Sequence, residues 1–172
     1  GLPALALGVD PPEEGQMREA PREADAPILG RQDWIDVLLV GCLMAASAMA
    51  LYFLPLWDGV RDAAEVSRSK LTLVFTLLAL SPLAHAFNCR SRVESIFSLG
   101  FFSNRFLVGA VVISALIHAV SLVVPTLQPV FRTDHHWSGQ EIAIVVAASL
   151  LPIPVVEAAK WLMRRRKKSE SA

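Results

Sequence analysis

The sequence predicts an all-α membrane protein with four transmembrane helices in a bundle. Three observations indicate this fold class. Hydrophobic residues make up 53% of the 172 positions, charged residues make up only 19%, and the apolar residues gather in four long runs. A helix needs roughly 20 apolar residues to cross a bilayer. A soluble domain is less apolar and carries more charge.

The first run follows the most polar stretch of the chain. Four prolines and mixed charges between residues 11 and 33 argue against a packed element, so we expect a loop over residues 9–33. The run itself, Val37 to Trp57, has no charged residue. Its small residues would let another helix approach closely. The aromatic residues near its ends suit the membrane interface: Trp34, Tyr52 and Trp57.

Three further runs follow, each after a polar connection. The second, Leu71 to Phe87, is the shortest, but at about 1.5 Å per residue it nearly covers a bilayer core of roughly 30 Å. The third runs from Phe106 to Val124 and the fourth from Ile142 to Leu162. Pro152 and Pro154 should kink the fourth helix. We therefore expect a four-helix domain over residues 34–163, a polar connection over 58–70 and a basic tail over 164–172.

The Lys and Arg residues of the loops predict the orientation, because their number and not the net charge decides it. The 9–33 loop, the 88–105 turn and the C-terminus should share one side of the membrane. That side carries most of the basic residues, and the other carries four: Arg61, Arg68, Lys70 and Arg132. Both termini should therefore be cytoplasmic. The RRRKK cluster at 164–168 could anchor this topology, bind anionic lipid, or do both.

Polar residues of the second run are candidates for an ion path. Ser81, His85 and Asn88 are spaced four and three apart, so they share a helix face. Pro82 beside them frees the carbonyl of Leu78, and interrupted helices line many transport sites. The alternative is hydrogen bonding to neighbouring helices, at about 0.6 kcal/mol each.

The third and fourth runs hold similar groups. Ser114, His118 and Ser121 form a stripe whose histidine could relay protons or simply pack. Glu157 and Lys160 are spaced as a helical ion pair, which favours local pairing over binding of a transported ion.

No sequence pattern indicates catalysis by this chain. It has no Gly-rich phosphate loop, no GxSxG, no HExxH and no Cys/His cluster, and Cys42 and Cys89 lie in unrelated settings. The zero net charge argues against a nucleic-acid partner.

Five strings, in order, carry a family resemblance. They are GLPALALGVDPP at the start, HAFNCRS at 85–91, GFFSNRFL at 100–107, VVPTLQPVF at 123–131 and VEAAKW at 156–161. Together they resemble the C-terminal membrane region of type II cation-transporting P-type ATPases, the calcium-pump group. The resemblance implies that the four runs correspond to helices seven to ten of such a pump.

The resemblance also implies which parts lie elsewhere in the pump. Residues 1–8 would be the end of a truncated sixth helix. The partners would be the missing N-terminal part of the same pump, the lipid bilayer and the transported cation, which the resemblance implies to be Ca²⁺. ATP and Mg²⁺ would be used by that missing part. The phosphorylated aspartate motif Asp-Lys-Thr-Gly is absent from this sequence, so the chain alone should be inactive. The compact loops favour a bacterial plasma membrane.

The resemblance also implies roles for individual residues, and this sequence departs from the family pattern at one of them. The 9–33 loop would couple the phosphorylation domain to the helices through its first residues: Asp10, Pro11, Pro12 and Glu13. In two-site calcium pumps helix eight supplies a carboxylate where this chain has Pro82, so no metal ligand and no catalytic residue is assigned here.

A free-standing four-helix membrane transporter or regulatory subunit is the alternative function. A transporter of this kind needs an ionisable residue near the middle of the membrane. His85 and His118 are the unpaired candidates.

Overall fold

The computed structural model describes residues 1–12, 25, 27, 29–53, 63–133 and 138–170. Within these ranges the secondary structure is helical, in the order α1 (Leu2–Leu7), α2 (Arg31–Phe53), α3 (Ala63–Asn88), α4 (Ile96–Leu99), α5 (Arg105–Val123), α6 (Gln128–Phe131), α7 (Gly139–Leu150) and α8 (Pro152–Glu170). Among the described residues, four segments are long and apolar enough to cross a membrane: Arg31–Phe53, Ser67–Asn88, Arg105–Val123 and Gly139–Arg165. The predicted all-α membrane fold is confirmed.

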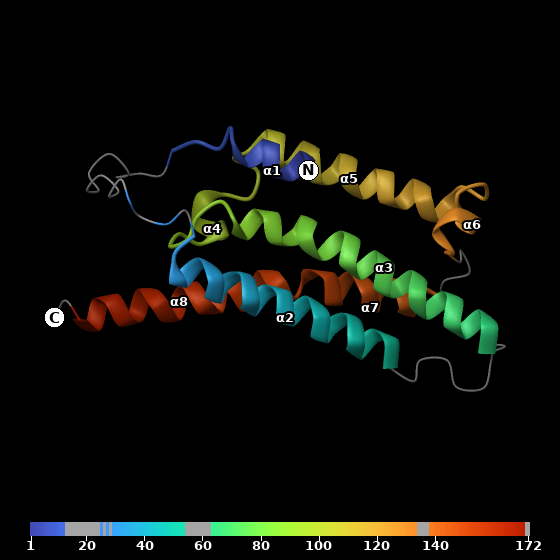
Figure 1. Cartoon of the computed structure of the whole chain (residues 1–172). Helices are drawn as coiled ribbons and strands as arrows, with labels where there is room; N and C mark the ends of the chain where they lie inside the picture. Colours follow the sequence, from blue (N-terminus) through green and yellow to red (C-terminus); the bar gives the residue numbers. More distant parts are fainter. Residues whose placement is uncertain (13–24, 26, 28, 54–62, 134–137, 171–172) are drawn as a thin grey trace.

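The long helices lie roughly antiparallel, with α3 in the middle of the bundle (Figure 1). At one end, here named the α4 end, α2 and α5 begin, α3 and α8 end, and α4 connects α3 to α5. At the other end, named the α6 end, α3 and α7 begin and α6 follows α5. The short α1 packs along α5. The described parts of the segments expected on one side of the membrane thus lie at one end of the molecule.

Two helices begin earlier than their apolar runs. α2 starts at Arg31, so residues 31–33, expected in the loop, are helical. The Asp33 carboxylate accepts a hydrogen bond of 2.7 Å from the Gly30 N–H and satisfies a backbone donor at this helix start. α3 starts at Ala63, so the second half of the expected 58–70 connection is also helical. Ala, Glu, Arg and Lys are good helix formers and extend a helix beyond the membrane.

The fourth run forms two helices, as its prolines predict. α7 ends at Leu150 and α8 begins at Pro152. Because Pro152 has no N–H, the helical ladder is interrupted, and the Leu151 N–H bonds to the Ala148 carbonyl at 3.3 Å. The expected tail continues as helix to Glu170. By contrast, α3 passes through Pro82 without a break.

Two apolar clusters hold the bundle together, and α3 contributes to both. Toward the α6 end, Leu73 and Leu77 of α3 pack with residues of α2 and α7: Ala48, Leu51 and Val145. Toward the α4 end, Ala86 and Phe87 of α3 pack with residues of α1, α4 and α5: Ala6, Ile96 and Leu107. The C-terminal end of α3 is therefore fixed from several sides.

Candidate functional site

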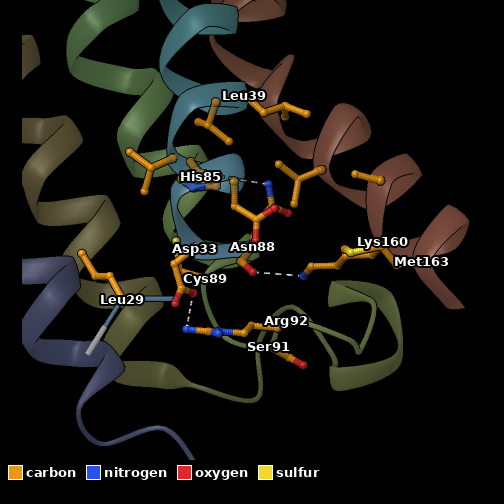
Figure 2. A pocket seen from close by; sticks show the side chains of 15 residues that line it. Leu29, Asp33, Leu39, His85, Asn88, Cys89, Ser91, Arg92, Lys160 and Met163 are labelled. Atoms are coloured by element: carbon orange, nitrogen blue, oxygen red, sulfur yellow. Dashed lines mark hydrogen bonds and ion pairs between the residues drawn. The ribbon is translucent and has the colours of Figure 1, made fainter. Parts of the chain in front are cut away.

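A cavity of about 260 Å³ lies at the α4 end, between α2, α3 and α8. Figure 2 shows His85, Asn88 and Cys89 from the end of α3 facing Asp33 from α2 and Lys160 from α8. Three more polar residues, Asp36, Ser91 and Arg92, also line the cavity. Apolar side chains form the rest of the wall: Leu29, Val37, Leu39, Val40, Val156, Ala159 and Met163. The cavity is thus an apolar space with ionisable groups at the end of the bundle.

Lys160 joins α8 to the connection that follows α3. Its ammonium group donates to the Asn88 carbonyl at 3.0 Å and to the Glu94 carbonyl at 3.2 Å, and lies 3.7 Å from a Glu157 oxygen. The Lys160 residue is 3% exposed. The same Glu157 oxygen accepts from the Ile96 N–H at 3.1 Å. The local pairing expected for Glu157 and Lys160 is confirmed, and a buried ammonium satisfied in this way fixes the two segments together.

Asn88 makes the main contact of the predicted polar stripe. Its side-chain N–H donates to the Pro152 carbonyl at 3.1 Å and lies 3.5 Å from His85 Nδ1. Asn88 is 3% exposed, and its side-chain oxygen has no hydrogen-bond partner in the described part of the chain. Asn88 therefore bridges α3 to the first residue of α8, where the fourth span is interrupted.

A second polar network lies on the other side of the α3 end and centres on Arg90. The Arg90 guanidinium contacts both oxygens of Asp10, the closest at 2.9 Å, and donates to the Gly100 carbonyl at 2.9 Å and to the Ser103 hydroxyl at 2.7 Å. Asn104 donates to the same Asp10 carboxylate at 3.0 Å. The Arg90 side chain is only 4% exposed. We call Asp10, Arg90, Ser103 and Asn104 the Arg90 network.

Asn104 also connects α1 to α5. Its amide donates to the Ala6 carbonyl of α1 at 3.1 Å, and its oxygen accepts from the Leu107 N–H at 2.9 Å, which caps α5. A capping residue of this kind typically stabilises a helix by about 1 kcal/mol. The Arg90 network therefore ties the end of α1 to the end of α3 and the start of α5.

The structure brings together only some of the predicted site residues. His85 and Asn88 line the cavity, but Ser81 is buried elsewhere along α3 and Pro82 is exposed. Pro11 and Pro12 are exposed beside Asp10, and Glu13 lies outside the described residues. An ion-path role for the α3 residues and a coupling role for the loop residues stay predictions.

His118 is held by neighbouring side chains. Its Nε2 lies 3.2 Å from the Thr76 hydroxyl, and its ring packs on Phe75 with centroids 4.9 Å apart. These contacts support the packing interpretation over a proton relay. In the described ranges, no group of three His, Cys, Asp or Glu residues could hold a metal ion.

Sequence reasoning missed Arg90, Ser103 and Asn104. Their signal was present, since an arginine shortly after one apolar run and an asparagine shortly before the next lie where membrane helices end and begin. Their partner Asp10 lies 80 residues from Arg90. A single sequence does not show which distant residues meet.

Known proteins are similar to this chain over nearly its whole length. The family described as "Cation transporting ATPase, C-terminus" matches residues 1–162. A calcium-transporting ATPase of Bacillus subtilis is 32% identical over 97% of this chain, and calcium-transporting ATPase 1 of Schizosaccharomyces pombe is 30% identical over 96%. The chain spans about a fifth of the length of these relatives, 18% in each. The chain belongs to the family of cation-transporting ATPase C-terminal domains, and it is an integral, multi-pass membrane protein.

Proposed function

We propose that this chain is the C-terminal membrane domain of an ATP-driven cation pump, with Ca²⁺ as the transported ion. In this proposal it supports the helices that hold the ions and connects them to the phosphorylation domain through the 9–33 loop. The rest of the pump supplies the ATP and Mg²⁺ site and the phosphorylated aspartate. The proposed location is a bacterial plasma membrane, with both termini in the cytoplasm. Family membership favours this function over a free-standing transporter or regulatory subunit.

The Arg90 network is the observation that carries the coupling role. Asp10 is the first charged residue after α1 and stands at the start of the 9–33 loop. Its carboxylate accepts hydrogen bonds from Arg90 and Asn104, which lie before and after α4 in the chain. A displacement of the loop would therefore act directly on the end of the central helix α3.

The exposed face of α2 has space for contact with further helices. Gly41, Ala45 and Ala46 are exposed, and a methyl group added at Gly41 would meet no other atom within 4 Å. Small residues allow close helix contact in a membrane. This face therefore has room for a neighbouring helix from the remainder of a pump.

Arg90→Gln in the parent pump tests the proposal. The change removes the charge that holds Asp10, and Arg105→Gln, at an exposed residue of the same end, removes an equal charge without touching the network. We expect ATP-driven Ca²⁺ uptake into vesicles to fall at least about tenfold in Arg90→Gln, a loss of about 1.4 kcal/mol. Phosphoenzyme formation from ATP should persist, because the phosphorylated site lies outside this chain.

Two results would count against the proposal. Arg90→Gln and Arg105→Gln could transport equally well, in which case the Arg90 network has no part in coupling. ATP hydrolysis by the purified 172-residue chain alone would contradict its assignment as a supporting membrane domain.

A further inference from the structure

A cavity larger than the one described above lies at the α6 end. Its volume is about 610 Å³, and it opens between the start of α3 and the short helix α6. Polar and basic residues form much of its wall: Ser67, Arg68, Gln128, Arg132 and Thr133. This wall has no described acidic residue.

Neither arginine of this cavity has an acidic partner among the described residues. Arg68 and Arg132 are both exposed, and among the described residues neither guanidinium pairs with a carboxylate. At the α4 end, by contrast, Arg90 and Arg92 pair with Asp10 and Asp33. Two like charges on one cavity wall attract an anion, and a guanidinium matches the geometry of phosphate.

The backbone holds Arg132 in a conformation that arginine seldom adopts. Arg132 ends α6 with φ 54° and ψ 37°, in the left-handed region that favours Gly or Asn. The next residue is anchored, because the Thr133 N–H bonds to the Gln128 carbonyl at 3.0 Å. The Gln128 side chain is tied in turn to the Leu122 carbonyl of α5 at 2.9 Å. This backbone conformation is unfavourable for arginine, so the presence of Arg132 here indicates a role for its side chain.

Thr133 adds a spare hydrogen-bonding group to the wall. The residue is 6% exposed, and its hydroxyl has no partner in the part of the chain that the structure describes. A buried hydroxyl without a partner is unfavourable, and a phosphate oxygen would be a suitable acceptor.

The cavity lies at the ends of two candidate membrane spans. The α3 span begins at Ser67, and the α5 span ends at Val123, shortly before α6. Apolar side chains beside the cavity are strongly exposed: Leu71 at 48%, Val130 at 72% and Phe131 at 47%. Basic groups next to exposed apolar groups at this level suit a molecule that has both a phosphate and acyl chains.

We propose that this cavity binds the phosphodiester headgroup of an anionic phospholipid. Arg68 and Arg132 contact the phosphate, and the acyl chains lie along Leu71 and Phe131. A soluble phosphate would use the guanidinium groups but not the apolar rim.

Lipid retention in native mass spectra of the purified chain tests this proposal. Phosphatidylglycerol and phosphatidylcholine are each titrated into detergent micelles. We expect the wild-type chain to bind one phosphatidylglycerol in preference to phosphatidylcholine. Arg68→Gln and Arg132→Asn should each weaken this binding about tenfold, the usual scale for one charge-assisted contact, and the double variant should lose the preference.

Controls make the result specific. Asn accepts the left-handed backbone, so Arg132→Asn should keep its helical circular dichroism, and Arg132→Gly provides a second variant with the same backbone tolerance. Arg105→Gln, at the α4 end, should bind phosphatidylglycerol like the wild type. No lipid preference in the wild type, or an undiminished preference in the double variant, would overturn the proposal. Displacement of the lipid by millimolar glycerol phosphate would assign the cavity to soluble phosphates and also overturn it.

Discussion

The central helix differs from the three spans around it in both burial and composition. Within an apolar 18-residue segment of each span, half of the α3 residues are buried inside the molecule, against 17% of the residues in each of the other spans. α3 also has the lowest mean hydropathy of the four. Its buried positions include several polar residues: Ser69, Thr72, Thr76, Ser81 and Asn88.

The outer spans show the opposite pattern. On α5, Val112, Ile113, Leu116 and Ile117 are each at least half exposed. In a bilayer, apolar side chains gain little by leaving lipid, so helix contacts depend on close packing and hydrogen bonds. The least apolar span is therefore the one in the interior. Stability should then depend on α3 and its contacts, while the outer faces tolerate change.

The largest expected effect is the loss of the buried ammonium that joins α8 to the end of α3. Lys160→Met leaves Glu157 without its cation and two carbonyls without their donor, so we expect a loss of about 3 kcal/mol in unfolding free energy. Circular dichroism during unfolding in mixed detergent and dodecyl sulfate micelles measures it. Arg165→Met is the control on the same helix, because Arg165 is exposed and its guanidinium stacks on Trp161. Equal losses in the two variants would show that burial at the α3 end does not matter.

Two leucines test whether a buried residue of α3 contributes more to stability than an exposed residue of α5. Leu77 of α3 is fully buried, whereas Leu116 of α5 is 61% exposed. Leu77→Ala should cost roughly 2–3 kcal/mol, since it opens a cavity, and Leu116→Ala should cost under about 1 kcal/mol, since lipid fills the space. The same unfolding assay applies. Similar costs at both positions would mean that α3 is not more closely packed than α5.

The smallest expected effect concerns one hydrogen bond between spans. Thr76→Val removes the hydroxyl that lies 3.2 Å from His118 and keeps the shape of the side chain. We expect a loss of about 0.6 kcal/mol. Thr126→Val, at an exposed residue between α5 and α6, should change nothing measurable. A loss above about 2 kcal/mol would indicate that His118 has a larger part than packing.

Hydropathy predicted the four spans but not their arrangement. The apolar runs locate the membrane segments because only the length of apolar chain matters for crossing. The starts at Arg31 and Ala63 were missed, because polar helix formers continue these helices into water. The central place of α3 was also missed. In a membrane helix the lipid-facing side is as apolar as the side that contacts other helices, so the sequence lacks the alternation of apolar and polar faces that marks the buried side of a soluble helix.

The candidate site was predicted in parts. His85, Asn88 and the Glu157–Lys160 pair stood out as polar groups in apolar runs, and the resemblance drew attention to Asp10. Their partners were not predictable: Asn88 meets Pro152 and Lys160 meets Glu94, residues more than 60 positions apart. These contacts depend on how helices pack, which a single sequence does not specify.

Labelling from the lipid phase tests most directly whether α3 is the core of this membrane domain. The unmodified chain is reconstituted in bilayers with a photoactivated carbene probe that partitions into lipid, and labelled residues are located by mass spectrometry. We predict strong labelling at Leu116 and Ile117 of α5 and little or none at Leu73 and Leu77 of α3. Labelling of Leu73 and Leu77 as strong as that of α5 would contradict the account.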